Sequence, residues 1–116
     1  MRLESKKLLE DVRQACELIR TFTADQTLDQ YVSNAMMKSA VERQFEIIGE
    51  ALRHLAAEDP AMISNIRDHR QIISFRNILI HGYDVIEDDV VWGVIQEKLS
   101  VLENQVESLL NETNQE

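Results

Sequence analysis

The sequence predicts an all-α protein, an up-and-down bundle of four helices with one short extra helix. Apolar residues recur at three- and four-residue steps along most of the chain. The 116 residues include only one proline and three glycines, the residues that tight turns favour, and aromatic residues, which strands favour, make up only 5%. This composition argues against a β-sheet with many turns. A chain of this length can bury a core as one domain. We expect that domain at residues 1–110, with residues 111–116 as a frayed tail.

The first half of the chain predicts two long helices around a short one. Residues 2–22 carry one apolar stripe, and residues 34–57 carry a second that ends at Asp59-Pro60. Between them, residues 27–32 suit a single turn of helix, followed by Ser33 as the expected N-cap of the second long helix.

Gly49 lies inside that second helix, where glycine costs ~1 kcal/mol relative to alanine. The helix either tolerates this strain or uses the missing side chain to let another backbone pack closely. The second interpretation is slightly favoured.

The second half predicts two more helices. The third covers residues 61–80, and Gly82 after it suits the left-handed conformation that often ends a helix. Asp84 and Glu87 have the spacing of a capping box, so a fourth helix should follow to about residue 110. The apolar stripe of this helix has heptad-like spacing and suits bundle packing. The stripe consists of Trp92, Ile95, Leu99, Leu102, Val106 and Leu109.

The charge distribution narrows the classes of ligand. A net charge of −9 argues against a general nucleic-acid binder, because affinity for phosphates comes from clustered lysine and arginine. The one basic segment is residues 61–81, where three arginines face a single aspartate. A phosphate-bearing ligand should therefore be drawn to the third helix.

The cellular setting follows from composition. Cys16 is the only cysteine, which excludes an internal disulfide, fits a reducing cytoplasm and suggests a core position on the first helix. The N-terminus does not resemble a signal peptide, and no segment has the ~20 apolar residues that cross a bilayer. We expect a cytoplasmic protein without a membrane partner.

The end of the third helix gathers the residues with useful chemistry. His81 can exchange a proton near neutral pH, and Arg76 can hold a phosphate through two hydrogen bonds. On a helical wheel Arg76 falls inside the apolar sector, so it needs a carboxylate or phosphate partner. The second helix has three acidic side chains on one face that could supply this partner: Glu42, Glu46 and Glu50. A purely structural ion pair with Arg76 is therefore an alternative to a functional role.

The other candidates also have two interpretations. His81 follows Arg76 by five positions, about 140° around an ideal helix, so the helix must end or a second chain must complete a shared site. A histidine there can also simply cap the helix. Tyr83 is either a half-buried anchor or a hydroxyl that contacts RNA or accepts a modification. Arg67 and Arg70 either face RNA or belong to a solvated surface.

Other chemistries find little support. The three histidines lack the spacing of a metal site, and there is no Gly-rich phosphate loop. We expect neither a metal nor a cofactor.

Two segments resemble the HepT group of HEPN-domain proteins, which are prokaryotic toxins of nucleotidyltransferase-paired toxin–antitoxin modules. Residues 40–51 read AVERQFEIIGEA, similar to the family's helix-two signature. Residues 76–83 read RNILIHGY and match its Arg-x4-His-x-Tyr motif without a gap. The likeness extends over nearly the whole chain.

The resemblance implies a HEPN-like homodimer with the motif lining a cleft between the two chains. It further implies a metal-independent endoribonuclease that acts on RNA, with tRNA one kind of target. The antitoxin, a nucleotidyltransferase, would neutralise the toxin by transferring AMP to Tyr83.

In this scheme, His81 is the general acid or base and Arg76 stabilises charge on the phosphate. Asn77 orients the imidazole of His81 or hydrogen-bonds the phosphate. Glu46 and Glu50 support Arg76. Two alternatives remain open: a non-catalytic HEPN dimer that binds the nucleotidyltransferase and accepts nucleotides, and a purely structural helical adaptor.

Overall fold

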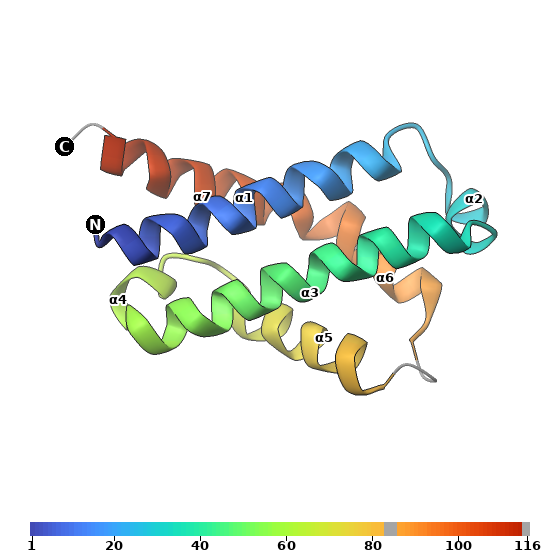
Figure 1. Cartoon of the computed structure of the whole chain (residues 1–116). Helices are drawn as coiled ribbons and strands as arrows, with labels where there is room; N and C mark the ends of the chain where they lie inside the picture. The colour runs from blue at the N-terminus through green and yellow to red at the C-terminus, as the bar shows by residue number, and fades with distance from the viewer. Residues whose placement is uncertain (83–85, 115–116) are drawn as a thin grey trace.

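The computed structural model describes residues 1–82 and 86–114 and confirms the all-α prediction, since these residues form helices and no strand. The long elements run alternately up and down, and the short α2 lies at one end of the bundle (Figure 1). The helices are α1 Leu3–Thr23, α2 Leu28–Val32, α3 Ala35–Glu58, α4 Pro60–Ile63, α5 His69–His81, α6 Asp88–Glu97 and α7 Leu99–Asn114.

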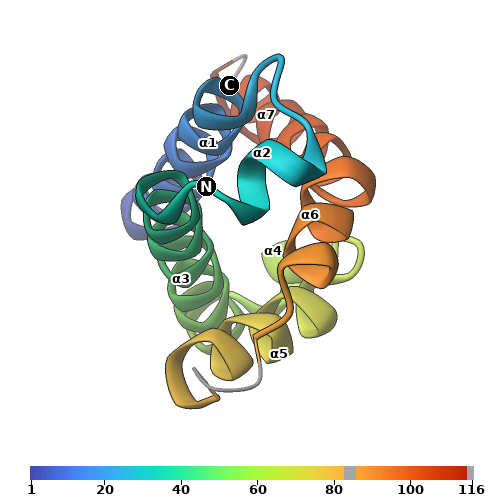
Figure 2. The same ribbon diagram turned by 90° about the vertical axis from the view of Figure 1, so that its right-hand side faces the viewer.

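Helix α3 is the central element of the bundle, because it packs against α1 on one side and α5 on the other. Helix α1 also packs against α7, so the long helices surround a common core when viewed along the bundle (Figure 2). None of the helices in the described part of the chain has the length and apolar character needed to span a membrane.

The core is built from the apolar stripes that the sequence predicted. Two aromatic pairs connect helices: Phe45 of α3 meets Phe75 of α5 edge-to-face at 5.2 Å between ring centroids, and Tyr31 of α2 meets Trp92 of α6 at 5.5 Å. Cys16 is buried in this core as expected, and burial raises the pKa of its thiol to about 12. Side chains with almost no exposure include Leu9, Val12, Ile19, Val41, Ile48, Leu52, Leu55, Ile66, Val91 and Val106.

The beginning of α3 differs from the prediction by one residue. Asn34, not Ser33, is the N-cap, and its side-chain oxygen accepts a hydrogen bond from the Met37 N–H at 2.9 Å. Ser33 instead follows the last residue of α2, and its hydroxyl donates to the Asp29 carbonyl at 3.0 Å. Two adjacent residues suited to capping thus serve two different helices.

The predicted helix at residues 61–80 is wrong as a single element, because the chain forms α4 and α5 with a turn between them. Asp68 has a left-handed backbone (φ 64°), which reverses the chain before α5 begins. Its carboxylate pairs with Lys98 Nζ at 3.2 Å, and the Arg67 N–H donates to Gln105 Oε1 at 2.9 Å. These contacts with the last two helices favour the turn over a continuous helix.

The last predicted helix is also divided, at Lys98 between α6 and α7. Most of the predicted stripe is buried, but Trp92 is only partly so. Helix α7 runs to Asn114, past the expected end near residue 110.

The expected left-handed conformation at Gly82 is wrong. Its φ is −119°, and its N–H closes α5 by donating to the Ile78 carbonyl at 2.8 Å. Gly82 therefore donates the last helical hydrogen bond of α5 without adopting a left-handed backbone. For the predicted capping box, Asp84 lies outside the described residues, and Glu87 precedes α6 without a side-chain cap.

The two candidate caps of α3 can be separated by mutation. Asn34→Ala should lower the free energy of unfolding by about 1 kcal/mol, because the Met37 N–H loses its acceptor. Ser33→Ala is the matched control and should cost less than half as much. Urea unfolding of both variants checks this, and equal losses would contradict the assignment of Asn34 as the cap.

Candidate functional site

The site is built on a close approach between α3 and α5. A Cβ atom added at Gly49 would lie 2.2 Å from Arg76 Cβ and 2.4 Å from Arg76 Cγ, both far inside van der Waals contact. The stem of Arg76 therefore crosses α3 directly over Gly49. This decides between the two interpretations of Gly49: the missing side chain permits close packing.

Arg76 has the carboxylate partner that its position demands. Its Nη2 donates to Glu50 Oε2 at 2.5 Å, and its Nη1 donates to Asn77 Oδ1 at 2.8 Å. The side chain is 19% exposed, and its Nε is buried without a hydrogen-bond partner in the described part of the chain. Of the three carboxylates considered from sequence, Glu50 is the one that pairs with Arg76.

Glu50 has two further partners, Arg53 and His54, that the sequence reasoning missed. Its Oε1 accepts from Arg53 Nη2 at 2.7 Å and lies 3.0 Å from His54 Nε2, while Arg53 Nε reaches Oε2 at 3.3 Å. The hydrogen bond and charge of Arg53, the charge of Arg76 and the hydrogen bond of His54 outweigh the opposing effect of burial and lower the pKa of Glu50 to about 2. The signal was present, because residues three and four positions apart share a helix face.

The other two carboxylates have different environments. Glu46 Oε2 pairs with Arg43 Nη1 at 3.3 Å. Burial, together with the nearby charge of Asp88, raises the pKa of Glu42. Neither carboxylate forms an ion pair with Arg76, so the acidic face of α3 divides into three separate environments.

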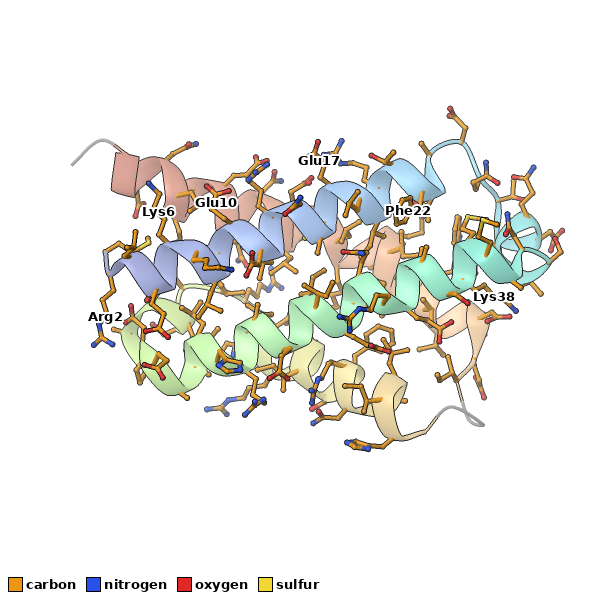
Figure 3. All side chains as sticks on the ribbon, viewed as in Figure 1. Arg2, Lys6, Glu10, Glu17, Phe22 and Lys38 are labelled. Atoms are coloured by element: carbon orange, nitrogen blue, oxygen red, sulfur yellow. The ribbon has the colours of Figure 1, made fainter. Side chains whose placement is uncertain are left out.

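A groove of about 260 Å³ runs over this cluster between α1, α3 and α5. The labelled Lys6, Glu10 and Glu17 of α1 lie on the side of that helix away from α3, so they do not border this groove (Figure 3). The groove has an apolar part, formed by Leu8, Ile47, Ala51 and Ile80, and a charged part, formed by Asp11, Arg43, Glu46, Glu50, His54 and Arg76.

His81 lies apart from this groove. It is the last residue of α5 and exposed, and its side chain forms no hydrogen bond or ion pair with the residues that the structure describes. Arg76 and His81 thus share a helix but do not converge within one chain. Two exposed apolar side chains, Ile78 and Ile80, lie close to His81 in sequence. Tyr83 lies outside the described residues.

The basic segment does not form one patch. Arg67 and Arg70 are exposed, but they lie at the N-terminal end of α5, which is about 18 Å from its C-terminal end for a helix of 13 residues. Neither lines the groove that contains Arg76. Across residues 1–82 and 86–114, no cluster of three or more histidine, cysteine or acidic side chains could hold a metal ion.

Comparison with known proteins gives the family. The model of the family described as "Ribonuclease HepT-like" matches residues 12–109, which is most of the chain. The chain belongs to the HepT-like ribonuclease family. This confirms the resemblance and supports an RNase-type function. No solved structure matches the chain.

Two curated relatives match this chain along nearly their whole length. "Putative RNase MJ1380" of Methanocaldococcus jannaschii is 30% identical over 102 residues, covering 88% of this chain and 93% of the relative. "Probable ribonuclease HepT" of Thermococcus cleftensis is 30% identical over 109 residues, covering 94% and 98%. The residues that the family model matches include the contact between α3 and α5.

The close packing at Gly49 can be tested against a second helical glycine. Gly49→Ala should lower the free energy of unfolding by about 1–3 kcal/mol, because the new Cβ displaces Arg76. At Gly93 of α6 an added Cβ would have no atom within 4 Å, so Gly93→Ala should stabilise the protein by up to ~1 kcal/mol. Denaturant unfolding of both variants gives the comparison, and stabilisation by both would contradict the packing argument.

The low pKa of Glu50 predicts a pH-dependent contribution to stability. A carboxylate with a folded pKa of about 2 and an unfolded value of about 4.3 stabilises the fold above pH ~4.3. That contribution is lost as the pH falls towards 2. Wild type should therefore be more stable than Glu50→Gln at pH 7, and the difference should shrink as the pH falls below ~4.3 and vanish only below about 2. The difference should be modest because Glu50 is 37% exposed.

Equilibrium unfolding at several pH values measures this convergence. A difference between the two proteins that stays constant from pH 7 to pH 2.5 would show that Glu50 does not act through its charge.

Proposed function

We propose that this chain is a metal-independent endoribonuclease and the toxin of a cytoplasmic toxin–antitoxin module. The observation that carries the proposal is the placement of Arg76. Its guanidinium lies on the α3–α5 seam, lines an open groove and already binds an oxyanion, the carboxylate of Glu50. His81 follows on the same helix, and the chain belongs to a ribonuclease family.

A homodimer would bring the two groups together. In one chain Arg76 lines the groove while His81 is exposed at the end of α5, about 140° away around the helix. If the α5 ends of two chains face each other, His81 of one chain can approach a phosphate held by the other. The half-exposed Ile78 supplies apolar surface for that contact.

The proposed reaction is an in-line attack of a ribose 2′-OH on the adjacent phosphorus. The bond from the 2′ oxygen to phosphorus forms as the bond to the 5′ oxygen of the next nucleotide breaks. His81 removes the 2′ proton or protonates the leaving oxygen, and water exchanges the other of these two protons. Arg76 stabilises the charge that develops on the non-bridging oxygens. Asn77 holds Arg76 Nη1, and Glu50 holds Nη2 in the free chain. Glu46 supports the same groove through Arg43.

The proposed regulation uses the residue that follows Gly82. A nucleotidyltransferase antitoxin would transfer AMP to Tyr83, adding bulk and negative charge next to His81, which repels RNA as a phosphate would. A net charge of −9 gives weak general attraction to RNA, so we propose a structured substrate such as tRNA. Arg67 and Arg70, at the far end of α5, are placed to contact a more distant part of such an RNA.

Cleavage of RNA by the purified chain in EDTA tests the nuclease. Wild type should cleave, while His81→Ala and Arg76→Ala should each lose roughly 10²–10⁴-fold in rate. Arg13→Ala is the matched control, because Arg13 lies on α1 away from the groove and, among the described residues, forms ion pairs with Glu10 and Glu17 of the same helix. Equal cleavage by all four proteins would point to a contaminating nuclease, and no cleavage of a broad RNA pool that includes tRNA would count against the proposal.

A second function is favoured by the charge of the site. The charge of Arg76 is neutralised within its own chain by Glu50, and the protein is acidic overall. Both observations suit a dimer that binds a nucleotidyltransferase and accepts nucleotides without cutting RNA. Expression in cells separates the two. If the protein is the nuclease, its expression arrests growth, and His81→Ala relieves the arrest while the fold is retained. If the protein only accepts nucleotides, its expression does not arrest growth, and Tyr83→Phe abolishes the nucleotide transfer.

A further inference from the structure

The carboxylate of Glu50 is bound as an oxyanion ligand would be. Two guanidinium groups and one imidazole from two helices surround it: Arg53 and His54 from α3, and Arg76 from α5. Together they contact both carboxylate oxygens at 2.5–3.3 Å. Guanidinium groups that converge on one oxyanion are also the usual arrangement for holding a phosphate.

We propose that Arg53, His54 and Arg76 form a phosphate-binding site that Glu50 occupies in the free protein. A phosphate of the ligand displaces the Glu50 carboxylate and takes over its cationic partners. The identity of that ligand as RNA rests on the proposed function, but the site itself does not. Arg53 and His54 lie outside the Arg-x4-His-x-Tyr motif, so the site extends the motif onto α3.

The hydrogen bonding of Arg76 is incomplete in a way that favours the exchange. Nε and Nη2 lie on one edge of the guanidinium and can bind two oxygens of the same anion. Glu50 accepts only from Nη2, because its other oxygen is bound to Arg53 and His54, and Nε has no partner in the described part of the chain. A phosphate has enough oxygens to accept from both atoms and still reach the other two side chains.

The packing decides which partner moves. The Cβ and Cγ atoms of Arg76 lie directly against Gly49, so the stem of the arginine is fixed by the α3–α5 contact. Glu50, in contrast, is 37% exposed and can turn towards solvent. Arg53 and His54 are about half exposed, so they can follow either anion. Displacement of Glu50 therefore leaves the helix packing unchanged.

Glu50 would then act as a built-in competitor for phosphate. It keeps the charge of Arg76 compensated when no ligand is bound, which avoids the cost of an unpaired, largely buried cation. It also weakens binding to any anion that cannot replace all its contacts. This gives an acidic protein selectivity at a site that would otherwise attract every small anion.

Titration with inorganic phosphate tests the site without reference to cleavage. The arginine Nε–H signals in nitrogen-15 NMR spectra report binding. Glu50→Gln should bind phosphate at least roughly tenfold more tightly than wild type, because one charge-assisted competitor is removed. Adding Arg53→Ala or His54→Ala to Glu50→Gln should reverse most of that gain.

Glu46→Gln is the matched control. It makes the same change in net charge in the same groove, but Glu46 pairs with Arg43 and not with Arg76. Glu50→Asp serves as a second variant if Glu50→Gln fails to fold. This substitution keeps the charge but shortens the side chain by one methylene. The carboxylate then lies further from Arg76, so phosphate binding should also become tighter.

The outcomes separate this site from the nuclease. Tighter phosphate binding by Glu50→Gln without any RNA cleavage by wild type would support the site and reject the ribonuclease. If Glu50→Gln gains no more affinity than Glu46→Gln, or if it binds phosphate more weakly than wild type, Glu50 only holds Arg76 in place and the inference is wrong.

Discussion

The contact between Gly49 and Arg76 is the constraint on which the rest of the site depends. No other residue type at position 49 leaves room for the arginine stem, which would collide with a Cβ at 2.2 Å. The contact brings α5 close to α3 and places the guanidinium beside Glu50, one residue further along α3. It also places Arg76 at the groove that α1, α3 and α5 share. The close packing of α3 and α5 and the position of the Arg76 guanidinium therefore both depend on Gly49.

The electrostatics of the site follow from that geometry. An arginine fixed in a largely apolar seam needs a counter-ion, and Glu50 supplies it while also binding Arg53 and His54. The cluster makes a compact oxyanion site on a protein whose net charge repels nucleic acid. Affinity for phosphate is thus concentrated at one point of the surface and is not spread over a basic face. Such a protein suits a selected ligand better than nucleic acid in general.

Sequence reasoning succeeded where a residue's role depends on its own helix. The long apolar stripes correctly predicted the bundle and the buried position of Cys16, because helical periodicity is a local property. It failed where contacts between helices decide the result. The break before α5 depends on the interactions of Asp68 with Lys98 and of Arg67 with Gln105, which are 30 and 38 positions apart in the chain. A helical wheel contains no information about such pairs.

The sequence by itself determined the fold class, the family motif and the need of Arg76 for an anionic partner, since each follows from residue type and spacing. Only the tertiary structure decided that the partner is Glu50 and not Glu42 or Glu46. It also decided that Gly49 permits close packing and that Arg76 and His81 stay apart within one chain. The reason is physical: which of several equivalent carboxylates an arginine meets depends on the distance and rotation between two helices, and these are set by packing.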